Sequence, residues 1–162
     1  ILNKALQKTQ APYVIFTDGD CIPRADFVAT HIKLKKVKHF LSGGYFKLSK
    51  NISVAISDDD IRTQRCFEKV WLLNKGLKNN FKTNKLTASG FKEQFLNRIT
   101  PTKATFDGMN VSVWKNDVIK VNGFDERMEY GGEDRELGER LINLDIKPIQ
   151  IRYSAICLHR VL

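Results

Sequence analysis

Apolar residues are spaced along the chain in two ways that predict strands and helices. Short apolar runs bounded by turn residues are typical of buried strands, and a three-to-four-residue period is typical of amphipathic helices. The short runs predict strands over Tyr13–Thr17, His39–Leu48, Pro148–Ile151 and Ala155–Leu158, and Ala104–Trp114 is predicted to hold a strand and a turn around Gly108. The helical period predicts helices over Ile1–Gln10, Arg24–Val37, Ser57–Asn74, Lys115–Val121 and Glu133–Leu144. The chain is therefore predicted to be α/β, and its 162 residues favour one domain.

Two segments leave their structure open. His39–Leu48 contains Gly43-Gly44, so it is predicted to be either one strand or a hairpin that turns at the glycines. Lys75–Thr102 is basic and interrupted, with helical spacing only around Phe91–Asn97. We interpret this second segment as a mobile flap or as an insertion that binds a substrate.

Two carboxylates separated by one glycine, Asp18-Gly19-Asp20, follow the predicted strand Tyr13–Thr17. Open α/β sheets bind ligands beyond the carboxyl ends of their strands, so these side chains are expected at a ligand site. Gly19 lets the backbone come close to that ligand. Adjacent hard oxygen donors favour a divalent cation such as Mg²⁺ or Mn²⁺, which is most useful for holding a diphosphate. The alternative is a calcium-type or plain turn.

A second acidic patch, Gly131-Gly132-Glu133-Asp134, stands at the start of a predicted helix. The two glycines allow a ligand to approach closely, and the first N–H groups of a helix are free to meet it. The helix dipole favours the ionised form of Asp134. The two acids either cap the helix or take part in chemistry, and these roles are compatible.

Four sequence blocks follow one another along the chain: Asp18-Gly19-Asp20, Gly108-Met109-Asn110, Asn122-Gly123-Phe124-Asp125 and Gly131-Gly132-Glu133-Asp134. Their order resembles that of the GT-A glycosyltransferases, especially bacterial family-2 enzymes and the carboxyl-terminal domain of the galactosyltransferases. The first block is similar to the DxD motif, and the resemblance runs from about Asn3 to His159. It implies a Rossmann-like GT-A fold, with a mixed sheet flanked by helices, over residues 1–162. It also implies a metal-dependent, inverting enzyme that moves a sugar from a nucleoside diphosphate sugar, by default a UDP-sugar, to an acceptor hydroxyl.

The resemblance assigns the metal ligands. Asp20 is implied to bind Mn²⁺ or Mg²⁺ directly, while Asp18 is implied to be a weaker ligand or a contact to the nucleoside ribose. His159, after the last predicted strand, is the candidate third ligand; its alternative is a structural histidine.

The resemblance also assigns the substrate contacts. Asp134 is implied to be the general base, and Glu133 to bind a carbohydrate or lipid-linked acceptor. Tyr130 stands where relatives place an aromatic ring against sugar, and Gly131 and Gly132 let the acceptor approach. The residues implied to shape the donor-sugar pocket are Asp107, Gly108 and Asn110.

The position of the DxD-like block differs from the family pattern. In the family a long segment holding the first strands and the nucleotide-base contacts precedes this block, whereas here the block begins at Asp18. We therefore expect the chain to be the carboxyl-terminal portion of a longer catalytic domain, folded but poorly active alone. A naturally short protein is the alternative.

The net charge of +9 is unevenly distributed. Six lysines and no acid lie between Ala29 and Ser57, and eight Lys or Arg with one acid, Glu93, lie between Lys69 and Thr105. These segments are either solvated surface or contacts for anionic lipid headgroups or an anionic acceptor. Nucleic acid is disfavoured because the segments lack regular aromatic interleaving and any nucleic-acid-binding motif.

Composition points to a cytoplasmic protein. No apolar run approaches the ~20 residues of a membrane span. The three cysteines are far apart and form no CxxC pair, which favours a reducing compartment over a disulfide framework or zinc site. The resemblance adds cell-envelope polysaccharide assembly, with peripheral association at the inner face of the membrane, as the expected context.

Two other functions compete with sugar transfer. Phosphatases and phosphotransferases also end a strand on DxD, but they need Thr or Val two residues after the second Asp, where this chain has Ile22. The third interpretation is a catalytically inert basic binding fragment, which would show no metal-dependent affinity for a nucleotide.

Overall fold

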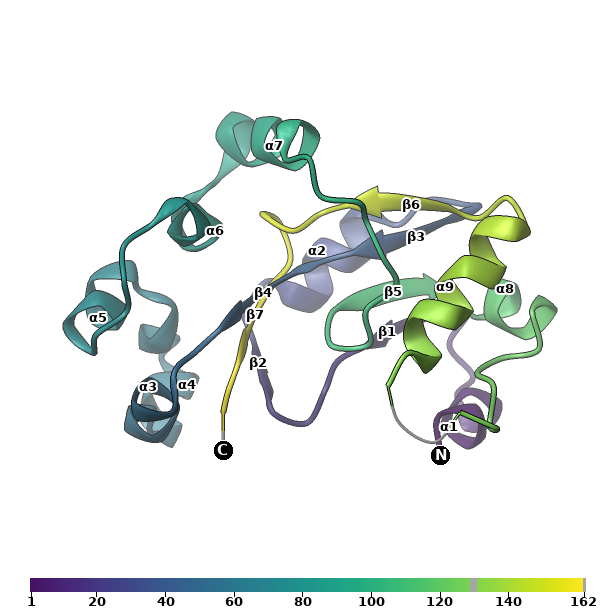
Figure 1. Cartoon of the computed structure of the whole chain (residues 1–162), viewed down its shortest axis with the longest axis horizontal. Helices are drawn as coiled ribbons and strands as arrows, with labels where there is room; N and C mark the ends of the chain where they lie inside the picture. Colours follow the sequence, from purple (N-terminus) through teal and green to yellow (C-terminus); the bar gives the residue numbers. More distant parts are fainter. Residues whose placement is uncertain (129–130, 162) are drawn as a thin grey trace.

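Two small sheets form the centre of the molecule, and the computed structural model describes residues 1–128 and 131–161 (Figure 1). The larger sheet has four strands in the order β1-β5-β3-β6. Their bounds are β1 Tyr13–Phe16, β5 Val111–Trp114, β3 His39–Ser42 and β6 Lys147–Gln150. Strand β5 is antiparallel to β1 and β3, whereas β3 and β6 are parallel, so the sheet is mixed.

The smaller sheet has three strands in the order β2-β7-β4, with bounds Cys21–Pro23, Ile156–His159 and Gly44–Lys47. Strand β7 is antiparallel to β2 and parallel to β4. Only Gly43 separates β3 from β4, so this stretch of chain passes directly from the larger sheet into the smaller. Strand β6 pairs in parallel with β3, and β7 pairs in parallel with β4, so the two sheets are joined along this stretch.

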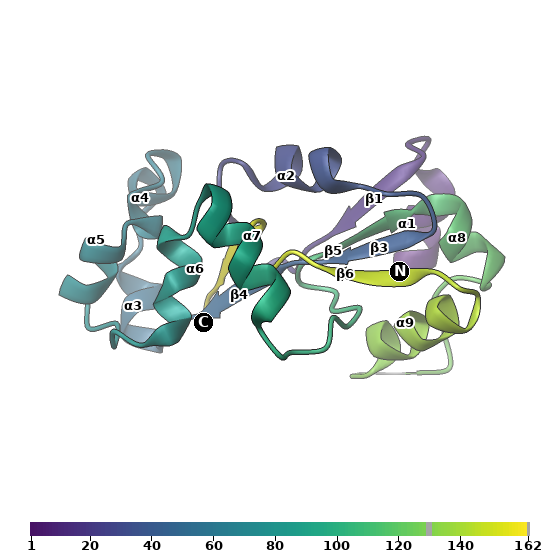
Figure 2. The same cartoon turned by 90° about the horizontal axis from the view of Figure 1, so that it is seen from above.

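Helices cover both faces of the larger sheet. Helix α2 (Phe27–Leu34) lies on one face, and α9 (Glu133–Asn143) lies on the other (Figure 2). Helix α8 (Lys115–Lys120) contacts α9, and α1 (Leu2–Lys8) lies near α8. This arrangement confirms the predicted mixed sheet flanked by helices.

The remaining helices form a lobe beside the smaller sheet (Figure 1). They are α3 Lys50–Ala55, α4 Asp58–Arg62, α5 Lys69–Asn74, α6 Asn84–Thr87 and α7 Gly90–Ile99, with 3-10 turns at Arg65–Phe67 and Phe81–Thr83. None of the helices in the described ranges has both the length and the apolar character needed to cross a bilayer.

Each sheet has its own hydrophobic core. Between the larger sheet and α9 the buried side chains include Phe40, Phe106, Val111, Leu137 and Leu141. Against the smaller sheet the lobe contributes buried side chains such as Ile52, Cys66 and Leu72, which pack with Phe46 and Leu158 from β4 and β7. Most of the apolar positions that predicted the elements are therefore those that form these cores.

Two predicted elements are wrong in form. The range Ser57–Asn74 is not one helix, although Ser57 does begin α4 with a capping box in which its Oγ accepts from Asp60 N–H at 3.2 Å. The helix stops because Gln64 adopts a left-handed φ of 62°, and the chain turns to bury Cys66 and Phe67 before α5 starts.

The hairpin alternative for His39–Leu48 is also wrong. Strands β3 and β4 do not pair with each other but continue one another into different sheets. Strand β2 and helices α3 and α6 were not predicted from the sequence.

Candidate active site

Asp18 and Asp20 lie in the turn that joins β1 to β2, at the strand end where the sequence predicted them. Strand β2 pairs with β7 in a register that puts Cys21 opposite His159. Asp20 consequently lies beside the end of β7, and its Oδ2 is 3.1 Å from Nε2 of His159. The backbone N–H of Arg160 donates to the carbonyl of Asp20 at 3.0 Å and closes the same corner.

Each side chain of the Asp20–His159 pair has one polar atom left over for a ligand. Asp20 Oδ1 and His159 Nδ1 are buried and have no hydrogen-bond partner among the described residues. A buried polar atom without a partner is costly, so a ligand that satisfied it would be favoured. A carboxylate suits Mg²⁺ and Mn²⁺, and an imidazole suits softer divalent metals, so the mixed pair fits Mn²⁺ better than Mg²⁺.

No three His, Cys, Asp or Glu side chains within residues 1–128 and 131–161 converge as a ready metal centre. Divalent cations such as Mg²⁺ often bind through one or two carboxylates and take substrate phosphates and water as their other ligands. The residues present therefore fit a cation that arrives with a diphosphate.

Asp134 reaches this region from the first turn of α9. Its Oδ2 accepts a hydrogen bond from the backbone N–H of Gly108 at 2.9 Å, and its Oδ1 accepts from the N–H of Arg135 at 2.7 Å. Asp107 precedes Gly108 in a turn that is closed by the Asn110 N–H donating to the Asp107 carbonyl at 3.0 Å. One hydrogen bond thus joins two blocks that lie 26 residues apart in sequence.

Four carboxylates, those of Asp18, Asp20, Asp107 and Asp134, form one acidic cluster with His159. Burial, and then repulsion from Asp20 and Asp107, raises the pKa of Asp18. Burial also raises the pKa of Asp107; a hydrogen bond from the Met109 backbone opposes this, and Asp134 adds to it. The cluster therefore concentrates negative charge that a bound cation would relieve.

Glu133 and two glycines stand at the start of α9. Gly131 and Gly132 have φ values of 85° and 99°, in the left-handed region that favours glycine. A Cβ on Gly131 would meet no atom of the described residues within 4 Å. Glu133 Oε2 is buried and has no partner among the described residues. Tyr130, which the sequence placed here, lies outside the described residues.

Asn110 lies behind the acidic cluster. Its side chain is 2% exposed, and its Nδ2 donates to the carbonyls of Gly44 and Ala155 at 2.7 and 3.0 Å. Its Oδ1 is 2.9 Å from Nε2 of His31, a fully buried histidine of α2. These contacts use the whole amide, so Asn110 holds the Asp107–Gly108 turn in place from within the protein.

His31 is a residue of this region that the sequence did not single out. Its Nδ1 is 2.7 Å from Ser112 Oγ, which is 2.8 Å from the hydroxyl of Tyr13. Burial lowers the pKa of His31 to about 4, so the ring is neutral at pH 7. The available signal was weak, because a histidine in an otherwise amphipathic helix marks neither a site nor a core position.

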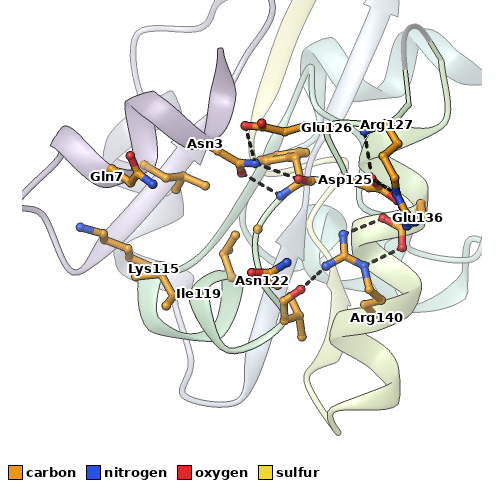
Figure 3. Close-up of a pocket in the computed structure, with 15 residues that line it drawn as sticks. Asn3, Gln7, Lys115, Ile119, Asn122, Asp125, Glu126, Arg127, Glu136 and Arg140 are labelled. Carbon is orange, nitrogen blue, oxygen red and sulfur yellow. Dashed lines mark hydrogen bonds and ion pairs between the residues drawn. The ribbon is translucent and has the colours of Figure 1, made fainter.

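A wide hollow of about 920 Å³ lies away from the cluster, next to α1, α8 and α9 (Figure 3). Its charged side chains mostly pair with one another, as Arg140 does with Glu136 and Arg127 with Asp125. The side chain of Asn3 forms two hydrogen bonds there with the backbone of Phe124. Its Nδ2 donates to the carbonyl and its Oδ1 accepts from the N–H, both at 2.8 Å. The Asn122–Asp125 block therefore has a structural role here, and no acid of the cluster lines this hollow.

The fold is α/β, with two mixed sheets flanked by helices, and is consistent with a glycosyltransferase-like fold. Residues 88–156 match a family model described as the N-terminal domain of galactosyltransferase, which supports a glycosyltransferase-related domain. The matched segment contains Asp107, Glu133 and Asp134, and it excludes Asp20 and His159. No curated protein matches the chain.

Proposed function

We propose that this protein transfers a sugar from a nucleoside diphosphate sugar, with UDP as the expected nucleotide, to an acceptor hydroxyl, with inversion and with a bound Mn²⁺ or Mg²⁺. The observation that carries this proposal is the acidic cluster. It brings Asp20 and His159 together at one strand end and sets Asp134 against Gly108 nearby.

The donor side uses the turn between β1 and β2. Asp20 and His159 would hold the cation, with Asp18 as a weaker ligand or ribose contact. When bound, the cation neutralises the diphosphate as it leaves. Asp107 and Gly108 lie on the same side and would shape the pocket of the donor sugar, with Asn110 supporting their turn from behind.

The acceptor side uses the start of α9. Asp134 takes the proton of the acceptor hydroxyl as that oxygen bonds to the anomeric carbon and the bond from this carbon to the diphosphate breaks. A carboxylate in this position can accept the proton directly from the hydroxyl oxygen. The Oε2 of Glu133, unpartnered among the described residues, would accept a hydrogen bond from another acceptor hydroxyl. Gly131 and Gly132 would let the sugar approach the helix start, and Tyr130 would stack against it.

The test compares Asp134→Asn with Asp145→Asn, an exposed control just beyond α9. Asparagine can still accept from Gly108 N–H but cannot take a proton, so we expect transfer to fall by ~10²–10⁴-fold. Affinity for UDP with Mn²⁺ and the melting temperature should change little. Transfer, donor affinity and melting are measured on each variant with a panel of acceptors. Near-normal transfer by Asp134→Asn would remove this residue from the mechanism.

We also propose that the lobe meets the anionic inner face of the cytoplasmic membrane, where an envelope acceptor would be found. Phe91 and Phe95 of α7 are 83% and 49% exposed and stack with their ring centroids 6.3 Å apart. The one acid between Lys69 and Thr105, Glu93, hydrogen-bonds Ser154 Oγ. Aromatic rings in a segment rich in lysine and arginine suit a surface of anionic lipid.

A further inference from the structure

Two cations lie beside the acidic cluster without a carboxylate partner. Lys85 of α6 and Arg152, in the turn between β6 and β7, line a cavity of about 30 Å³ together with Tyr45 and Asp107. Within the described ranges neither cation forms an ion pair. This is unusual, because a cation that is partly removed from water is normally paired with a carboxylate.

The environment of both cations is unfavourable without a ligand. Arg152 Nε is buried and has no hydrogen-bond partner among the described residues. Lys85 Nζ donates to the carbonyl of Tyr45 at 2.9 Å and lies 5.6 Å from the centre of its ring. Burial, and then repulsion from Arg152 and Lys82, lowers the pKa of Lys85 to about 8.

The protein nevertheless holds Arg152 firmly in this place. A Cβ on Gly44 would lie 2.0 Å from the carbonyl oxygen of Arg152, so only glycine lets β4 pass this close to the turn. The next two residues are bound by α7, since Asn97 accepts from the N–H of Tyr153 at 2.9 Å and donates to Ser154 Oγ at 2.8 Å. The backbone at Arg152 is therefore held in place while its side chain has no carboxylate partner among the described residues, as expected for a residue that binds a ligand.

We propose that Lys85 and Arg152 form a subsite for an oxyanion, a phosphate or carboxylate group of a substrate. The subsite adjoins the acidic cluster because Asp107 lines the same cavity and the ring of Tyr45 packs edge-on against His159 with centroids 6.3 Å apart. The proposal rests on the proposed function for the identity of the substrate. The anion is either the diphosphate of the donor or an acidic group on the acceptor sugar.

The test measures anion affinity in Lys85→Gln and Arg152→Gln, with Lys78→Gln as an exposed control from the same lobe. One arm uses inorganic pyrophosphate with Mn²⁺ in calorimetry, and the other compares glucuronate with glucose by NMR. Loss of a charge-assisted hydrogen bond predicts a drop of about tenfold or more. A drop for pyrophosphate identifies the donor diphosphate as the source, and a drop for glucuronate but not glucose identifies an acidic acceptor.

Further variants separate binding from structure. Lys85→Arg keeps the charge, and we expect it to keep the affinity that Lys85→Gln loses. Lys85→Gln removes a cation repelled by Arg152, so its melting temperature should rise or stay unchanged. Wild-type affinity of both Gln variants for pyrophosphate and glucuronate would overturn the subsite. Neither arm requires sugar transfer, so the subsite can fail or stand independently of Asp134 and the proposed reaction.

Discussion

At the scale of single residues, a directed chain of buried hydrogen bonds supports the candidate site. Both amide hydrogens of Asn110 are donated to backbone carbonyls, so its Oδ1 is the atom that faces His31. Because Oδ1 can only accept a hydrogen bond, Nε2 of His31 must carry the proton. Nδ1 of neutral His31 then accepts from the hydroxyl of Ser112, whose oxygen accepts from Tyr13. Protonation of His31 would turn Nδ1 from an acceptor into a donor, so the Ser112 hydroxyl could no longer donate to it.

The protein is therefore expected to lose stability as His31 is protonated. Its pKa is lowered to about 4 in the folded state, so its contribution is present above the ordinary pKa of 6.5 and is lost as pH falls toward 4. The size is on the order of 3 kcal/mol. Urea unfolding of wild type and His31→Asn between pH 7 and 4 should show a smaller pH dependence in the variant. The partly exposed His39→Asn serves as control, and equal slopes in wild type and His31→Asn would contradict this role.

At the scale of elements, the packing of α9 sets the distance between Asp134 and Gly108. Gly138 faces the larger sheet, and a Cβ there would lie 2.6 Å from Cβ of Phe106. Phe106 precedes Asp107 in the segment before β5, so the close approach of α9 to this segment at Gly138 also determines where the Asp107–Gly108 turn meets the helix start. A helix held further away would break the Asp134–Gly108 hydrogen bond.

We predict that Gly138→Ala destabilises the protein and impairs transfer. Overpacking costs about 1–3 kcal/mol, against roughly 1 kcal/mol gained from helix propensity, so the net loss should be on the order of 1 kcal/mol. Urea unfolding and a transfer assay measure the two effects. Glu139→Ala, at the next and exposed position of α9, should show neither. A Gly138→Ala protein as stable and active as wild type would mean that α9 can shift at this contact without loss of packing or function.

At the scale of the whole molecule, charge is unevenly distributed. The acids of the cluster gather where the two sheets meet the start of α9, while the lobe carries much of the +9 net charge. On α7, Phe91, Phe95 and Ile99 recur at four-residue spacing and are all exposed. The lobe therefore presents a face that is both basic and aromatic.

Binding to vesicles is expected to depend on this face. The double variant Phe91→Ala/Phe95→Ala should bind phosphatidylglycerol vesicles about tenfold or more weakly than wild type, because two aromatic rings no longer leave water. Added salt should weaken wild-type binding, and phosphatidylcholine vesicles should bind poorly. Co-sedimentation measures each case, with the exposed Ile119→Ala of α8 as control. Equal binding of the double variant and the control would exclude α7 from membrane contact.

The sequence by itself determined most of the local structure. Apolar periodicity predicted β1, α2, α8 and α9 because a buried face forces a regular spacing of apolar residues. Glycine and acidic residues at a strand end and a helix start indicated where a ligand would bind. That Asp18, Asp20, Glu133 and Asp134 serve sugar transfer stays a prediction, with the family match supporting the glycosyltransferase relation.

Only the tertiary structure decided which of these residues meet. Asp20 reaches His159 through the β2–β7 register, and β2 is too short to leave a period in the sequence. Asp134 meets Gly108 because α9 packs on the larger sheet, and Lys85 and Arg152 line one cavity although they lie far apart in sequence. These are contacts between distant segments, and they depend on strand pairing and side-chain packing, which a pattern along the chain does not record.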